Sequence, residues 1–205
     1  MFHEENVTMR KKIAITGGIG SGKSTVLNLL RNAGYCCFSC DEIYNDLIKD
    51  EGYVRKIQSL FPDVVIQGVI DRVRLSEIVF KNTAARKQLN ELAHAQIMLR
   101  LYNEMNTASA LLVFAEIPLL FEGNYQNEFD GVIVVMRDKS TRVNAVCDRD
   151  KATKESVEAR INAQYDYSAL LQNIENFDVP IYIIENNANY DTLASQVLSI
   201  VKQFS

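Results

Sequence analysis

The chain has 205 residues and a formal net charge of −4, from 22 Lys and Arg against 26 Asp and Glu. This length suits one domain, with or without an insertion, and buries enough apolar surface to fold without a disulfide or a structural metal. An acidic balance without a basic run argues against sequence-independent nucleic-acid binding, which requires a cationic face. No apolar run approaches the roughly 20 residues of a bilayer span, and segment 1–12 lacks the apolar stretch of a secretory signal. We therefore expect a cytoplasmic protein without membrane partners, with residues 1–8 as a tail ahead of a start at Met9.

Five short apolar runs predict buried strands, because they barely alternate with polar residues, as in parallel strands covered on both faces. The runs are 12–16, 35–39, 111–115, 132–136 and 181–184. Amphipathic patterns separate them, and the last strand is followed by a helix that begins near Asn189. This order predicts an α/β fold with a five-stranded parallel sheet flanked by helices.

A long segment with a mostly helical pattern, about 41–107, separates the second and third predicted strands. Its clearest helix is predicted at 85–106, with an apolar stripe formed by Leu89, Leu92, Leu99 and Tyr102. We expect this segment to be a helical insertion that binds the acceptor of a reaction.

Residues 17–24, GGIGSGKS, fit the phosphate-loop pattern G-x-x-x-x-G-K-[ST] between a predicted strand and a predicted helix. Glycines let backbone N–H groups turn toward an anion, and the helix N-terminus adds partial positive charge. Lys23 is expected to reach the β- and γ-phosphates of ATP, and the Ser24 hydroxyl to ligate Mg²⁺. The predicted nucleotide-binding residues are Gly18, Ile19, Gly20, Ser21, Gly22, Lys23, Ser24 and Thr25. The alternative is a glycine-rich turn without a ligand.

Two features of the sequence argue against other classes of phosphate-loop protein, the GTPases and the large mechanochemical ATPases. The chain contains no N-K-x-D tetrapeptide of the kind that reads guanine, and it is too short for a mechanochemical ATPase. A small phosphate-loop chain with a helical insertion suits a kinase that encloses a small acceptor and excludes water.

An acidic residue, Asp41, follows the second predicted strand, downstream of the phosphate loop. Other distinctive stretches are GVIDR at 68–72, LAH at 92–94, EIPLLFE at 116–122, RD at 149–150, R-x-x-x-Q at 160–164 and NN at 186–187. In these features the sequence resembles the dephospho-CoA kinase family. The resemblance extends over about residues 12–200, and the stretches at 68–80 and 116–122 discriminate most, because the phosphate loop alone is generic.

The resemblance implies a single phosphate-loop kinase domain at 9–205. Its core would be about 12–40 and 108–205, its acceptor-binding insertion about 41–107, and its helical lid about 138–172. The implied reaction is phosphorylation of the ribose 3′-hydroxyl of dephospho-CoA by ATP with Mg²⁺, the final step of coenzyme A synthesis. The chain would act as a monomer or a small homo-oligomer.

Three side chains carry the implied catalysis. Asp41 would be the general base that contacts the acceptor hydroxyl; alternatively it caps a helix at 41–49. Lys23 would follow the γ-phosphate. Arg149 would stabilise charge on the transferring group or stack on adenine, with a solvated helix face as the alternative.

The remaining implied residues bind the two substrates. Glu116, directly after a predicted strand, would hold Mg²⁺ through water or fix the acceptor, and Arg72 would anchor an acceptor phosphate. Pro118, Leu119 and Leu120 would shape the acceptor pocket or form plain core. Asn186 and Asn187 would read adenine or form a turn.

Several positions depart from the family pattern: Ser39, Asn45, Ala95 and Ala145. Ala145 occupies the place of a second lid arginine, which Arg142 would compensate from one turn earlier. Two other functions stay open: another small-acceptor kinase, such as a nucleoside monophosphate kinase, or a nucleotide-binding regulator without turnover. The four cysteines, Cys36, Cys37, Cys40 and Cys147, favour use as small core residues over a zinc or redox site.

Overall fold

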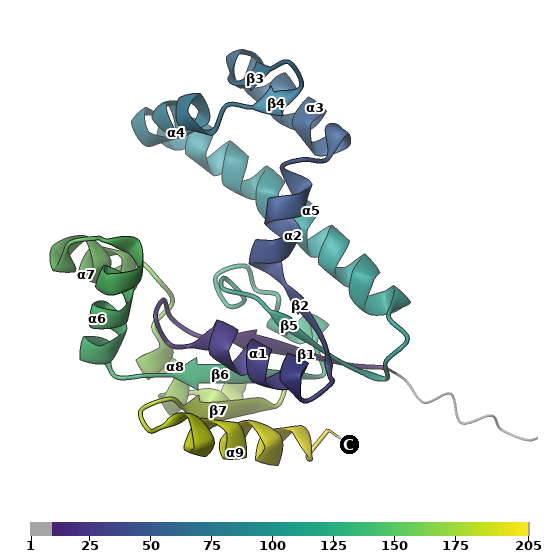
Figure 1. Cartoon of the computed structure of the whole chain (residues 1–205), viewed down its shortest axis with the longest axis vertical. Helices are drawn as coiled ribbons and strands as arrows, with labels where there is room; N and C mark the ends of the chain where they lie inside the picture. Colours follow the sequence, from purple (N-terminus) through teal and green to yellow (C-terminus); the bar gives the residue numbers. More distant parts are fainter. Residues whose placement is uncertain (1–9, 205) are drawn as a thin grey trace, which may run out of the picture. The chain divides into compact units, whose positions relative to one another are not determined.

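The structure is a computed structural model that describes residues 10–204 (Figure 1). The predicted tail at 1–8 and the predicted start at Met9 lie outside the described residues. Contacts divide the chain into two compact units. Unit 1 comprises the described residues of Met1–Phe38 and Ala108–Ser205, and unit 2 comprises Ser39–Thr107. The functional roles predicted for core, insertion and lid stay predictions.

The described residues of the chain form one five-stranded sheet in the order β2-β5-β1-β6-β7. Its strands are β1 (Lys11–Thr16), β2 (Cys36–Ser39), β5 (Leu112–Glu116), β6 (Gly131–Met136) and β7 (Ile181–Glu185). The central strand β1 pairs in parallel with both β5 and β6, and β6 pairs in parallel with β7. The predicted α/β fold with a five-stranded parallel sheet is confirmed, and each strand begins and ends within one residue of its predicted bounds.

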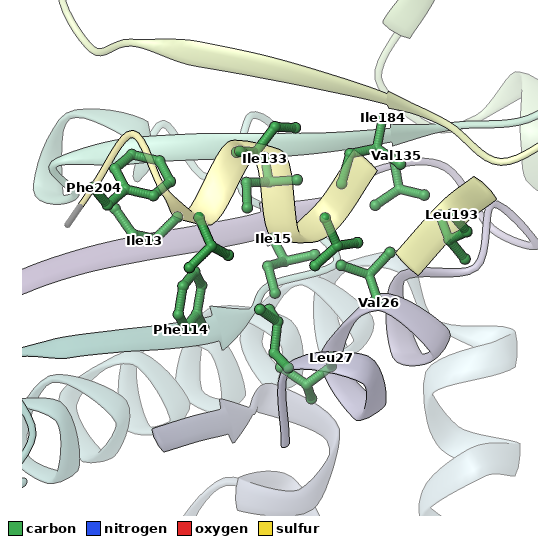
Figure 2. Close-up of a cluster of buried hydrophobic side chains, with 14 residues drawn as sticks. Ile13, Ile15, Val26, Leu27, Phe114, Ile133, Val135, Ile184, Leu193 and Phe204 are labelled. Atoms are coloured by element: carbon green, nitrogen blue, oxygen red, sulfur yellow. The ribbon is translucent and has the colours of Figure 1, made fainter. Parts of the chain in front are cut away.

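One face of this sheet is covered by α1 (Lys23–Asn32) and α9 (Tyr190–Val201), which also contact each other. Figure 2 shows their side chains meeting those of the strands in one apolar cluster. Its buried members are Ile13, Ile15, Val26, Leu27, Leu30, Phe114, Ile133, Val135, Ile184, Leu193, Val197, Ile200, Val201 and Phe204. Burying a side chain of this kind stabilises the fold by roughly 1.5–3 kcal/mol. The helix predicted to begin near Asn189 is confirmed as α9. Asn189 caps it by accepting a hydrogen bond from the Thr192 N–H.

The segment between β6 and β7 is mostly helical. It contains α6 (Lys139–Asp150), α7 (Lys154–Asn162), α8 (Tyr167–Gln172) and the short 3-10 turn η3 (Ile174–Asn176). Another 3-10 turn, η2 (Gln126–Glu128), lies between β5 and β6. Helices α6 and α7 pack together through Val143, Val146 and Val157. Side chains alternate along a strand, so Thr16 faces away from the cluster that contains Ile13 and Ile15. Tyr167, the first residue of α8, reaches Thr16 on that opposite face.

Unit 2 has its own apolar cluster, which includes Tyr53, Ile57, Val64 and Leu75. Its elements are α2 (Cys40–Leu47), α3 (Glu51–Leu60), η1 (Pro62–Val64), β3 (Val65–Ile66), β4 (Val69–Ile70), α4 (Arg72–Lys81) and α5 (Thr83–Thr107). Sequence analysis missed the antiparallel hairpin β3–β4. Its turn is made by Gln67 and Gly68, with φ of 51° and 78°, both in the left-handed region that two-residue hairpins require.

The helix predicted at 85–106 is present as α5, but its predicted apolar stripe is wrong in the second half. Leu99 is 56% exposed, whereas Met98, Leu101 and Met105 are buried. At 100° per residue these three lie on the side of the helix opposite Leu89 and Leu92. The two halves of this long helix therefore bury opposite faces, and a single stripe along its length does not describe it.

Residues 10–204 contain no helix that is long and apolar enough to cross a membrane. The same residues contain no group of three or more His, Cys, Asp or Glu side chains placed to hold a metal ion. None of the four cysteines, all of which lie within residues 10–204, forms a disulfide. Cys40 is buried, Cys37 packs against the sheet cluster and Cys147 packs against the α6–α7 cluster. Cys37, Cys40 and Cys147 therefore serve as small packing residues.

Candidate active site

The phosphate loop connects the end of β1 to the start of α1, and Gly22 is its most constrained residue. Gly22 is the N-cap of α1 with φ 99°, and its carbonyl accepts the first hydrogen bond of the helix from the Val26 N–H at 3.1 Å. A Cβ at this position would lie 2.2 Å from Asn186 Nδ2. Any other residue would therefore be strained in its backbone and would displace Asn186.

The ammonium group of Lys23 lies over the start of this loop. Its Nζ donates hydrogen bonds to the carbonyls of Gly17 at 3.0 Å and Gly18 at 3.3 Å. The positive charge therefore sits beside the N-terminus of α1, where the helix dipole also favours an anion.

The first turn of α1 is tied to the end of β5 by Ser24 and Glu116. Ser24 Oγ donates a hydrogen bond of 3.0 Å to Glu116 Oε1, and Glu116 is only 4% exposed. The register pairs Ile15 with Glu116, so the carboxylate lies next to the strand that leads into the loop. A hydroxyl and a carboxylate are the hard oxygen donors that Mg²⁺ prefers, and this pair fits that ion.

The paired asparagines hold the loop against the ends of β6 and β7. Asn186 Nδ2 donates to the Ser21 carbonyl at 2.8 Å, while Asn187 and Asp138 exchange two hydrogen bonds of 2.9 and 3.1 Å. Both asparagines therefore fix backbone at the nucleotide end of unit 1. Their predicted contact with adenine stays a prediction.

Three side chains from segment 138–172 hold the residues at the start of the loop. Arg142 Nε donates to the Ile19 carbonyl at 2.9 Å, and Gln164 Oε1 accepts from the Ile19 N–H at 2.7 Å. The hydroxyls of Tyr167 and Thr16 lie 3.2 Å apart in a buried position, and burial raises the pKa of Tyr167 to about 12. These contacts join residues more than a hundred positions apart. The sequence pointed to Gln164 through the R-x-x-x-Q resemblance and to Arg142 as a substitute for a lid arginine, and it gave no signal for Tyr167.

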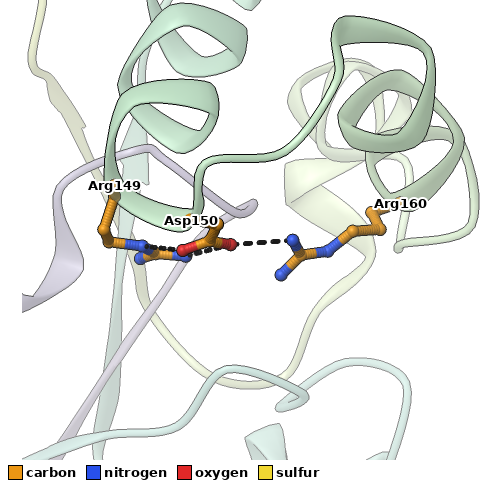
Figure 3. A network of polar contacts seen from close by, with 3 residues as sticks. All are labelled: Arg149, Asp150 and Arg160. Carbon is orange, nitrogen blue, oxygen red and sulfur yellow. Dashed lines mark hydrogen bonds and ion pairs between the residues drawn. The ribbon is translucent and has the colours of Figure 1, made fainter.

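Arg149, the predicted lid arginine, belongs to a separate network with Asp150 and Arg160 (Figure 3). Arg149 donates to both Asp150 oxygens, at 2.7 and 3.2 Å, and Arg160 donates to Oδ2 at 2.8 Å. These bonds favour the charged carboxylate and hold the pKa of Asp150 well below its usual range, Arg149 contributing most. The network ties the end of α6 to α7, and the role of Arg149 in catalysis stays a prediction.

The PLLFE stretch after β5 divides between surface and core. Pro118 is half-buried, Leu119 is 36% exposed, and Leu120 is fully buried. Phe121 packs in an aromatic cluster with Tyr165, Tyr167 and Phe177, at centroid distances of 4.8, 6.1 and 5.5 Å. The buried residues therefore form core, and the acceptor role predicted for Pro118, Leu119 and Leu120 stays untested.

Two predicted site residues, Asp41 and Arg72, belong to unit 2. Asp41 is exposed in the first turn of α2, whose N-cap is Ser39. The alternative interpretation of Asp41 as a helix cap is therefore wrong, because the helix begins one residue before it. Arg72 is the exposed first residue of α4 and lines a cavity of about 200 Å³ with Tyr44 and Tyr53. Its contact with an acceptor phosphate stays a prediction.

The parallel sheet, the glycine-rich loop at the end of its central strand, and the Lys23 and Ser24 side chains define a P-loop nucleotide-binding protein. A family model described as dephospho-CoA kinase matches residues 11–192. The chain belongs to the dephospho-CoA kinase family. The resemblance drawn from the sequence is thereby confirmed.

Individual relatives agree over nearly the whole chain. The chain is similar to a dephospho-CoA kinase of Listeria innocua, at 30% identity over 96% of this chain and 98% of that protein. It is similar to one of Geobacillus kaustophilus at 33% identity, with the same coverage of both chains. A solved structure from Thermus thermophilus matches with a TM-score of 0.79 and 30% identity, over 96% of this chain and 99% of that one. The dephospho-CoA kinase of Campylobacter jejuni matches with a TM-score of 0.68 and 26% identity, over 96% and 98%.

Proposed function

We propose that this protein transfers the γ-phosphoryl group of ATP to the ribose 3′-hydroxyl of dephospho-CoA, yielding ADP and CoA in the final step of coenzyme A synthesis. The observation that carries the proposal is family membership across residues 11–192 together with an intact phosphate loop. A biosynthetic role of this kind belongs in the cytoplasm, where the chain would act as a monomer or small homo-oligomer.

Binding of the nucleotide is supported by the loop. Its backbone N–H groups and the N-terminus of α1 favour phosphate, and Lys23 supplies a mobile positive charge beside them. Thr25, exposed in the first turn of α1, would contact the α-phosphate. Asn186 and Asn187 would complete the adenine end.

Ser24 and Glu116 would hold Mg²⁺ between the loop and β5. The two side chains contact each other at 3.0 Å, so both oxygen donors lie at the same place. When bound, the ion supplies charge neutralisation at the β- and γ-oxygens of ATP. The buried Glu116 carboxylate accepts the hydrogen bond of the Ser24 hydroxyl and so orients it.

Asp41 would act on the acceptor. An exposed carboxylate in the first turn of α2 is free of a capping duty and is available to accept the proton of the 3′-hydroxyl as that oxygen attacks the γ-phosphate. Lys23 and Arg149 would stabilise the charge that develops on the transferring group. Arg72, Pro118, Leu119 and Leu120 would bind the remainder of the acceptor.

A panel of acceptors tests the assignment. ADP release is measured with ATP and Mg²⁺ in the presence of dephospho-CoA, AMP, CMP, dTMP or shikimate, with Lys23→Ala as the control for contaminating kinases. Turnover with dephospho-CoA alone supports the proposal. Turnover with another acceptor would assign a different small-molecule kinase, and ATP binding without transfer to any acceptor would assign a regulator.

A further inference from the structure

Arg142 places a guanidinium group directly on the phosphate loop. It projects from α6, is half-buried, and donates from Nε to the Ile19 carbonyl at 2.9 Å. A Cβ built on Gly18 would lie 2.2 Å from Arg142 Nη2 and 2.7 Å from Cζ. The guanidinium therefore occupies the space over Gly18 that any larger residue would fill.

Ile19, which accepts the hydrogen bond from Arg142, is held at both its N–H and its carbonyl group. Gln164 accepts from the Ile19 N–H at 2.7 Å, while Arg142 binds the Ile19 carbonyl. The next loop residue, Gly20, lies against the backbone of Arg142, where an added Cβ would approach the Arg142 carbonyl oxygen to 2.8 Å. Loop and helix are therefore in close contact at the position from which the Arg142 side chain projects.

The charge of Arg142 has no protein counterion among residues 10–204. Within these residues, the guanidinium makes one hydrogen bond, to the Ile19 carbonyl. It forms no ion pair with a described carboxylate. Partial burial lowers the pKa of the Arg142 guanidinium, yet arginine remains protonated. A half-buried cation is costly unless an anion approaches it, and Arg149 differs in this respect because Asp150 neutralises it.

We propose that Arg142 is a further phosphate-binding residue, whose terminal N–H groups bind the β- and γ-phosphates of the nucleotide held in the loop. Nε remains on the Ile19 carbonyl, and the two Nη groups supply four N–H donors in a fixed plane. The inference rests on the nucleotide-binding part of the proposed function. Arg142 would supply from α6 the positive charge of a second lid arginine, whose place, one turn further along the helix, is occupied by Ala145.

Binding measurements without an acceptor test this role. A non-hydrolysable ATP analogue with Mg²⁺, and separately AMP, are titrated into wild type, Arg142→Gln and Arg142→Lys by calorimetry. Arg142→Gln should weaken the ATP analogue by at least about 10-fold, because a charge-assisted hydrogen bond is lost, and should change AMP affinity by less than about 2-fold. Arg142→Lys keeps the positive charge, so its affinity for the ATP analogue should lie between those of wild type and Arg142→Gln. The matched control is Arg55→Gln, the same change on the exposed face of α3, which should bind like wild type.

Three outcomes would overturn the inference. These are wild-type affinity of Arg142→Gln for the ATP analogue, equal losses of ATP analogue and AMP, and equal impairment of the Gln and Lys variants. The last two would mean that Arg142 only supports the loop. Thermal unfolding of each variant shows whether it is folded, and Arg142→Lys carries the test should Arg142→Gln not fold. Because no acceptor is present, the result is independent of whether dephospho-CoA is the substrate.

Discussion

Ser24 Oγ and Glu116 Oε1 lie 3.0 Å apart, although the two residues are 92 positions apart in the sequence. The contact joins the first turn of α1 to the end of β5 and brings together the two oxygen donors proposed to hold Mg²⁺.

Glu116→Gln should therefore change the magnesium requirement of the reaction. Glutamine can still accept a hydrogen bond from Ser24, but it lacks the negative charge that attracts the cation. We expect the Mg²⁺ concentration for half-maximal activity to rise by about 10-fold, which corresponds to about 1.4 kcal/mol. Initial rates across a Mg²⁺ titration measure this. The exposed Glu128→Gln is the control, and an unchanged Mg²⁺ profile in Glu116→Gln would remove Glu116 from the metal site.

Asp41→Asn should lower kcat far more than it changes KM for dephospho-CoA. A positioned general base contributes on the order of 10²–10⁴ in rate, and it acts mainly in the transition state. Steady-state kinetics with varied acceptor give both constants. Asp46→Asn, at a second exposed aspartate of α2, is the matched control, since Asp46 forms an ion pair with Lys49 at 3.5 Å. If Asp41→Asn raises KM alone, Asp41 binds the acceptor and the base lies elsewhere.

Lys23→Ala should reduce kcat/KM by about 10²–10³, the range seen when one donor to a developing negative charge is removed. The ammonium group over the Gly17 and Gly18 carbonyls is the charge that would follow the γ-phosphate. Lys49→Ala removes a lysine from an exposed ion pair and serves as the control. Near-normal turnover of Lys23→Ala would contradict the assignment of the loop.

Tyr167→Phe should destabilise the fold at neutral pH by about 0.5–1.5 kcal/mol, because it removes one buried hydrogen bond with Thr16. The folded-state pKa of Tyr167, about 12, lies above the ordinary value of 10.0, so folding favours the neutral phenol. This contribution is complete below pH 10 and is lost as the pH rises from 10 to 12.

Urea unfolding of wild type and Tyr167→Phe at pH 7, 9 and 11 measures that difference. The gap in unfolding free energy should be constant between pH 7 and 9 and should shrink at pH 11. Tyr190→Phe, at a 55% exposed tyrosine, is the control and should leave both values unchanged. A gap that does not depend on pH would show that Tyr167 is not held neutral by burial.

The sheet was predictable because its signal is local. Each strand of a covered parallel sheet is a continuous apolar run, and the phosphate loop needs glycines at fixed spacing, so both are visible in the sequence. The short hairpin β3–β4 left a weaker signal, two apolar pairs around Gln67-Gly68. Leu99 was misassigned because α5 buries opposite faces along its length.

The sequence marked Arg142 and Gln164 as candidate residues, but it did not predict which groups they contact, and it gave no signal for Tyr167. Arg142 in α6, Gln164 just after α7 and Tyr167 in α8 lie 123, 145 and 151 residues downstream of the residues that they contact. Which side chains meet at the loop depends on how α6, α7 and α8 pack after β6, and no local pattern encodes it. Arg149 is a similar case. The sequence marked it as part of an Arg-Asp pair, but it did not predict the two hydrogen bonds that Arg149 donates to Asp150.

The most direct test of the central claim is the position of the new phosphate. Wild-type protein is incubated with ATP, Mg²⁺ and dephospho-CoA, and the product is analysed by mass and by phosphorus NMR, with Lys23→Ala in parallel. The account predicts CoA with its phosphate on the ribose 3′-oxygen, formed by wild type and nearly absent with Lys23→Ala. A phosphate on another oxygen, or no product from a folded protein that binds ATP, would contradict it.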